Sequence, residues 1–129
     1  MTASNQSRTA GADVPAKVSA ALAECDAQHR QAARMPEGTP AEHAARAARL
    51  ALVCARRAGW WRVLERWAYL DGGLHVVHGR AARAARGAEQ QRARFWRDTA
   101  RDWRARAAGD PRGSGMWAMG DRLDVPGVA

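Results

Sequence analysis

Arginine is the residue type with the clearest chemical potential in this chain, and it is concentrated in one segment. Residues 80–106 contain nine arginines against three acidic residues, Glu89, Asp98 and Asp102. Six of these arginines are separated by three residues, by four residues or by sums of these intervals, which places them on one side of a helix. We call them the arginine row: Arg80, Arg83, Arg94, Arg97, Arg101 and Arg104. Because a guanidinium forks onto phosphate oxygens, the row predicts a face that binds a phosphate backbone.

Two tryptophans, Trp96 and Trp103, each stand one position before an arginine of the row. Exposed there, they would give bases or guanidinium planes a surface on which to stack. The alternative is that four residues continue a helical core: Trp96, Ala100, Trp103 and Ala107. Asp98 and Asp102 favour this alternative, because each lies three or four residues from arginines with which it can pair. Both interpretations stay open, since charge rows on helices commonly face solvent.

The segment 55–60, Ala-Arg-Arg-Ala-Gly-Trp, resembles the turn of a helix-turn-helix motif. It has a small residue four positions before Gly59 and an apolar residue directly after it. The motif also requires an apolar residue six positions beyond the glycine, where this chain has Glu65. A DNA-reading helix over residues 61–69 is therefore a minor alternative.

Cysteine and histidine occur at spacings that helices could turn into a zinc site. Cys25 and His29 lie one turn apart, and His75 and His78 share a helical face, with Cys54 on a third segment. Such sites are normally completed by carboxylates or a second histidine pair, and nothing in the sequence requires these segments to meet. Buried thiols and hydrogen-bonded histidines are commoner, so we expect no metal and no cofactor.

Residue sets typical of enzymes are missing from the sequence. It contains no serine, histidine and aspartate order of a hydrolase, no phosphate-cradling glycine loop and no paired carboxylates in an apolar setting. The single tyrosine, Tyr69, stands beside Leu70 in an apolar stretch. We therefore expect a protein without enzymatic activity.

The net charge of +8 indicates a polyanionic partner: nucleic acid, an anionic membrane surface or an acidic protein. Residues 1–15 lack the apolar core of a signal peptide, and no stretch is long and apolar enough to span a bilayer. Two cysteines are too few for a disulfide scaffold. We expect a cytoplasmic protein that has reduced thiols and does not enter the membrane.

Apolar residues recur at helical spacing through the middle of the chain, which is typical of a packing face. We call this set the apolar stripe: Val53, Trp60, Val63, Trp67, Leu70, Leu74, Val77, Ala81, Ala84, Ala88 and Phe95. Leucine, valine and phenylalanine supply only 16 residues in all, so the core must rely on alanine and six tryptophans. Because such a core is thin for a monomer, we expect a homo-oligomer that associates through the exposed part of the stripe.

Local signals mark the beginnings of two helices. Residues 1–12 are small and polar and predict a flexible arm. Asp13 is predicted to be the N-cap of a first helix that continues to about Met35. Thr39 and Glu42 form a capping box, the sharpest local signal in the chain, and predict the start of a second helix.

The second helix should end near Leu70, where Gly72 and Gly73 interrupt the pattern. The apolar stripe stays in phase across these glycines, which favours one continuous helix. Against this, two glycines cost about 2 kcal/mol inside a helix, and a straight rod would leave the stripe in water. We therefore expect a turn, and then a third helix from Leu74 to a left-handed cap at Gly109.

Residues 110–129 form a tail rich in glycine and proline that contains Met116, Trp117 and Met119. These side chains either fold back onto the helices or dock on a partner protein.

The sequence thus predicts an all-α fold, a small helical bundle over residues 13–109 with flexible ends. In this bundle the two long helices form an antiparallel hairpin and the first helix packs alongside. The function we expect is non-enzymatic binding of nucleic acid, in which the arginine row contacts phosphates largely without reading bases. The alternative is a helical adaptor or regulator that engages a protein through the apolar stripe or the tail.

Overall fold

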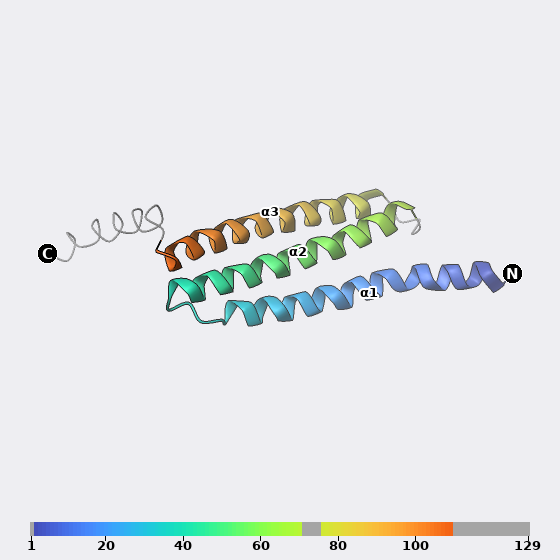
Figure 1. The fold of residues 1–129 in the computed structure, drawn as a ribbon. Helices are drawn as coiled ribbons and strands as arrows, with labels where there is room; N and C mark the ends of the chain where they lie inside the picture. Colours follow the sequence, from blue (N-terminus) through green and yellow to red (C-terminus); the bar gives the residue numbers. More distant parts are fainter. Residues whose placement is uncertain (1, 71–75, 110–129) are drawn as a thin grey trace.

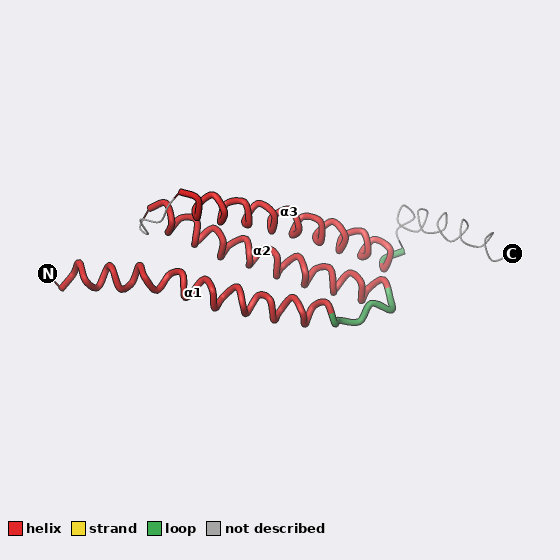
Figure 2. The backbone as a smooth tube through the Cα atoms, turned by 180° about the vertical axis from the view of Figure 1, so that it is seen from behind, coloured by secondary structure: helices red, strands yellow, loops and turns green. Residues whose placement is uncertain are grey.

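Three long helices form the fold of the computed structural model, which describes residues 2–70 and 76–109 (Figure 1). They are α1 (Thr2–Ala33), α2 (Pro40–Leu70) and α3 (Val76–Ala107). α2 lies in the middle and packs on both α1 and α3, while the described residues of α1 and α3 do not contact each other (Figures 1 and 2). The predicted all-α bundle of three main helices is confirmed.

α2 and α3 run antiparallel along most of their length. Tyr69, near the end of α2, lies against Gly79 near the start of α3. At the opposite end of the pair, His43 of α2 stacks on Trp103 of α3. The predicted hairpin is confirmed, and the alternative of one continuous helix is excluded. The glycine pair, residues 72–73, lies outside the described residues.

The caps of the hairpin helices lie where local sequence places them. The Glu42 N–H donates a hydrogen bond to Thr39 Oγ1 (3.1 Å), which satisfies one free donor of the first turn of α2. Pro40 occupies the first helical position, where a missing N–H costs nothing. α3 ends shortly before Gly109, whose φ of 72° lies in the left-handed region that glycine adopts without strain.

α1 begins earlier than the sequence predicts. We expected a flexible arm over residues 1–12 and an N-cap at Asp13, but the helix starts at Thr2 and contains Pro15. A proline inside a helix costs about 3 kcal/mol, yet α1 passes through Pro15 and extends beyond the end of α2 (Figure 1).

Small residues make most of the contact between α2 and α3. α2 buries Ala44, Ala47, Leu50, Ala51, Val53, Cys54, Ala58 and Ala68. α3 buries Gly79, Ala82, Glu89, Ala93 and Ala100. Alanine and glycine bring the helix backbones close together, so that methyl groups fill the interface instead of large side chains. On α1, which packs on α2 alone, Val18, Cys25 and Ala32 are buried.

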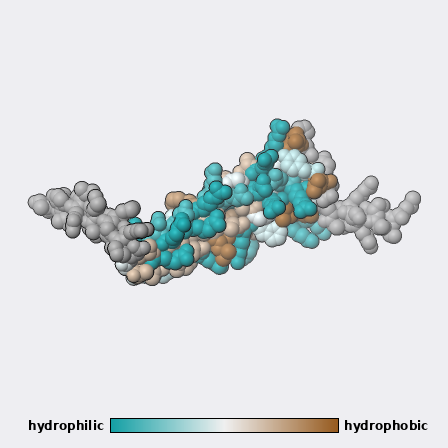
Figure 3. Space-filling model, turned by 45° about the horizontal axis from the view of Figure 1, so that its top comes forward, coloured by the Kyte–Doolittle hydropathy of each residue, from teal (hydrophilic) through white to brown (hydrophobic). Residues whose placement is uncertain are grey.

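We expected the apolar stripe to be the packing face, and this expectation is wrong. Val53 is buried and Trp67 and Ala88 are half-buried, whereas the other described members are exposed: Trp60, Val63, Leu70, Val77, Ala81, Ala84 and Phe95. The exposed fraction reaches 68% at Leu70. The reason is that closely packed helices select small residues, and on α3 these lie one or two positions away from the stripe, at Gly79, Ala82 and Ala93. In Figure 3, hydrophobic surface gathers towards the end at which α2 stops and α3 starts.

Gly79 lies at the tightest contact of the hairpin. A Cβ atom built on Gly79 would lie 2.6 Å from Cζ of Tyr69, much closer than carbon atoms pack. Glycine therefore leaves the space that the tyrosine ring occupies.

Arg57 connects the two outer helices through α2. Its guanidinium pairs with Asp26 of α1 and lies 4.0 Å from Oε1 of Glu89 on α3. Glu89 is only 6% exposed, and Nη1 of Arg92 lies 2.7 Å from the same Oε1 atom. One buried carboxylate and one arginine thus link helices that do not touch each other.

The helix-turn-helix interpretation is also wrong. Gly59, which would mark the turn, lies inside α2, and the helix is unbroken on both sides of it. Its neighbours are alanine, arginine and tryptophan, and a single glycine costs only about 1 kcal/mol in a helix. Residues 61–69 therefore continue the same helix and are no separate recognition helix.

Candidate functional site

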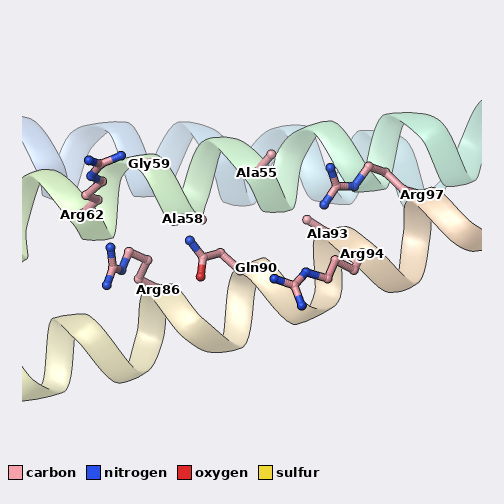
Figure 4. Close-up of a pocket in the computed structure, with 9 residues that line it drawn as sticks. All are labelled: Ala55, Ala58, Gly59, Arg62, Arg86, Gln90, Ala93, Arg94 and Arg97. Carbon is pink, nitrogen blue, oxygen red and sulfur yellow. The ribbon is translucent and has the colours of Figure 1, made fainter.

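A groove of about 330 Å³ lies between α2 and α3, beside part of the arginine row (Figure 4). We call it the arginine groove. α2 lines it with Ala55, Ala58, Gly59 and Arg62, and α3 lines it with Arg86, Gln90, Ala93, Arg94 and Arg97. Four arginines and no acidic residue line the groove, so it carries a local excess of positive charge.

Small residues at the helix contact create the floor of the groove. Ala58 and Ala93 are buried where α2 and α3 meet, and Gly59 lies beside them. A Cβ atom built on Gly59 would have no neighbouring atom within 4 Å. The space above Gly59 is therefore open, in contrast to Gly79, where the tyrosine ring fills it.

Three of the four arginines of the groove have no acidic partner among the described residues. Nε of Arg86 lies 3.2 Å from Oε2 of Glu65, which balances its charge. Arg62, Arg94 and Arg97 make neither an ion pair nor a hydrogen bond with any residue that the structure describes. Positive charges held near one another without counter-charges attract an anion from solution.

The rest of the arginine row is divided between free and occupied groups. Arg101 pairs with Asp98 three residues earlier, and Nε of Arg104 donates to the Ala100 carbonyl oxygen (3.3 Å). Arg80 and Arg83 are exposed towards the start of α3 and have no ion pair within the described part of the chain. Of the predicted row, Arg94 and Arg97 are the members that line the groove.

Trp103 does not line the groove and packs against α2 instead. Its ring stacks on His43 with the centroids 4.0 Å apart, and the guanidinium of Arg106 lies 4.3 Å from its centroid. Ala100 is fully buried beside it, whereas Ala107 is exposed. These contacts agree with the core interpretation for this part of the helix.

Trp96 is half-buried and does not line the groove either. Its ring contacts Phe95 edge to face, and the Arg46 guanidinium of α2 lies 5.9 Å from its centroid. The structure therefore does not bring Trp96 and Trp103 together with the groove arginines, and neither ring lies open above the groove.

The candidate zinc ligands do not gather. Among the described residues, no group of three or more histidine, cysteine, aspartate or glutamate side chains is arranged to hold a metal ion, and His75 lies outside this part of the chain. Burial raises the pKa of both thiols, Cys25 and Cys54, and Glu89 contributes to the increase at Cys54. The thiols therefore stay protonated and unreactive at neutral pH.

Two further predictions concern the tail and membrane spans. Met116, Trp117 and Met119 lie outside the described residues. None of the helices as described has a stretch of the length and apolarity needed to cross a bilayer.

Sequence reasoning missed the α2 half of the groove. Arg62 and Gly59 lie far from the arginine row in sequence, and only the antiparallel register of the hairpin brings them next to Arg94 and Arg97. A pattern of small residues on both helices was the available signal, because it marks where two backbones pack closely. No family model, curated protein or solved structure matches this chain, so the geometry of the groove carries the functional argument.

Proposed function

We propose that this protein binds nucleic acid through its phosphate groups, with the arginine groove as the centre of the contact, and that it has no enzymatic role. One observation carries the proposal. Arg62, Arg94 and Arg97 come from two helices to one groove and have no counter-charge among the described residues. Because arginine binds phosphate in a forked geometry, such a cluster is suited to a chain of phosphates.

Arg80 and Arg83 extend the positive face along α3 and add two more exposed guanidiniums to the three in the groove. If all five contact phosphates, the logarithm of the duplex binding constant falls against the logarithm of salt with a slope of about −4.5. Binding of this kind depends on charge, so it is expected to be strong at low salt and weakly dependent on sequence.

The test compares two triple variants that have the same net charge. One is Arg62→Glu, Arg94→Glu and Arg97→Glu, in the groove. The matched control reverses three exposed arginines elsewhere: Arg30, Arg34 and Arg49. Each reversal lowers the net charge by two, so both variants carry +2 in place of +8.

Binding to a fluorescent DNA duplex of 20 nucleotides per strand is followed by fluorescence polarisation at several salt concentrations. The helicity of each variant is checked by circular dichroism. The groove variant should lose most of its affinity and its salt dependence, and the control should keep a clear part of both. Equal losses in the two variants would show that net charge alone attracts the DNA. Absence of binding by the unmodified protein at low salt would refute the proposal.

A second candidate function is an adaptor for a protein partner, and one observation favours it. The part of the apolar stripe on α3 faces solvent as an outer stripe of Val77, Ala81, Ala84 and Phe95, with exposed fractions of 57% at Val77 and 61% at Phe95. Arg80 and Arg94 flank it, so the matching partner would be an amphipathic helix with acidic flanks. Substituting Phe95→Ser should weaken such binding and leave DNA affinity unchanged.

A further inference from the structure

We infer that the arginine groove holds one unpaired nucleotide, with its base on the alanine and glycine floor, and that the protein therefore prefers single-stranded nucleic acid to duplex. This inference rests on the proposed function and names the substrate class of the same site.

The composition of the groove points beyond phosphate alone. Its floor is lined by Ala55, Ala58, Gly59 and Ala93. Ala58 and Ala93 are buried, so Ala55 and Gly59 supply most of the uncharged surface that is open to an occupant. The small residues that let α2 and α3 pack closely thus leave an uncharged surface beside the arginines. A flat base can lie on such a surface and remove both from water.

The volume of the groove agrees with an occupant larger than one phosphate group. About 330 Å³ lies at the lower end of the range for small-molecule sites, which is about 300 to 1,000 Å³. A nucleoside with its phosphate would contact the floor through its base and the groove arginines through its phosphate.

The polar groups of the groove suit a base as well as a phosphate. Gln90 lies between Arg86 and Arg94 along α3, and its amide has no hydrogen-bond partner among the described residues (Figure 4). An amide both donates and accepts, which is what the edge of a base requires. The planar guanidiniums of Arg62 and Arg94 can also stack on a base while they contact phosphate.

A duplex cannot use the floor in this way. Its bases are paired and stacked, so it offers the groove only the phosphate backbone, and turning a base outward requires that pairing and stacking be broken. A single strand presents its bases without this cost. At about 25 cal/mol per Å² of apolar surface removed from water, covering roughly 40 Å² raises affinity by about fivefold, and we expect at least this preference.

The experiment uses the full chain and three fluorescent DNA probes of 12 nucleotides per strand: single-stranded oligothymidine, an abasic strand with the same phosphates, and a duplex. Two variants test the floor. Gly59→Leu places a side chain in the open space of the groove, and Gly87→Leu is its control, since a Cβ at Gly87 also has no neighbour within 4 Å but does not line the groove. Gln90→Ala is a third variant that changes an exposed side chain and leaves the backbone packing intact.

The protein should bind oligothymidine at least about fivefold more tightly than the abasic strand and the duplex. Gly59→Leu should remove this preference and keep the abasic affinity within about twofold, Gln90→Ala should reduce the preference, and Gly87→Leu should retain it. Equal affinity of the unmodified protein for the oligothymidine and abasic strands would overturn the inference while leaving the proposed function intact. Failure to bind any of the three probes would refute the proposed function itself. If Gly59→Leu does not fold, a preference that Gln90→Ala leaves unchanged would also count against the inference.

Discussion

The three described helical glycines of the hairpin give a stability prediction that depends on one side chain. Gly59, Gly79 and Gly87 all lie inside helices, where alanine is more favourable than glycine by about 0.5–1 kcal/mol. At Gly59 and Gly87 a Cβ atom meets nothing within 4 Å, so each alanine variant should gain that full amount. At Gly79 the same atom would lie 2.6 Å from Cζ of Tyr69, and two other ring atoms would lie within 3.0 Å.

The cost at Gly79 follows from this distance. Carbon atoms pack at about 3.5 Å or more, so the Tyr69 ring must retreat by about 0.9 Å. Overpacking of this kind costs about 1–3 kcal/mol, and the lower end applies here because Tyr69 is 47% exposed and lies near the end of α2. Gly79→Ala should therefore be neutral or destabilising, whereas Gly87→Ala is stabilising.

Urea unfolding followed by circular dichroism measures the three variants, each in the original chain and in a Tyr69→Ala background. Without the ring, Gly79→Ala should become as stabilising as Gly87→Ala, which gives a coupling energy of about 1–2 kcal/mol between positions 69 and 79. Equal gains for Gly79→Ala and Gly87→Ala in the original chain would refute the proposed close contact.

Three other predictions concern the cap, the thiols and self-association. Thr39→Ala should lower the free energy of unfolding by about 1 kcal/mol and Thr39→Ser should preserve it, and equal stability of the alanine variant would contradict the cap. Burial raises the pKa of Cys25 and Cys54, so the unfolded chain releases these protons first as the pH increases. The stability that the two thiols contribute is present below a pH of about 8.5 and falls above it by up to about 1.4 kcal/mol per pH unit for each thiol. The free energy of unfolding of a double alanine variant, measured from pH 7 to 10, should therefore depend less on pH than that of the original chain. Parallel pH curves for the two proteins would count against this. Sedimentation equilibrium should show association that Val77→Ser and Phe95→Ser abolish, and a monomer at every concentration of the original chain would end that expectation.

The parts of the fold that the sequence predicted are those governed by nearby residues. Thr39 with Glu42 and the left-handed Gly109 each act within one helical turn, so their chemistry can be read without a fold. The packing face could not be read in this way, because large residues such as Phe95 attract attention whereas the close contact selects Ala82, Ala93 and Ala100. Size and hydrophobicity indicate what should leave water, but not which residues allow two backbones to approach.

The candidate site shows the same division. Arg94 and Arg97 could be predicted because they share one helix and one spacing. Arg62 could not, since its place beside them depends on the register of two antiparallel helices. Trp96 and Trp103 were assigned to a site by adjacency to arginines, yet neighbouring positions on a helix point about 100° apart. Adjacency in a helix therefore separates side chains more often than it joins them.

The attachment of α1 to α2 alone has a consequence for motion. Since no described residue of α1 contacts α3, α1 can detach while the hairpin, with its groove, stays assembled. Amide hydrogens in α1 would then exchange faster than those along the facing sides of the hairpin, and opening would bring the sulfur of Cys25 into solvent before the rest of the molecule unfolds.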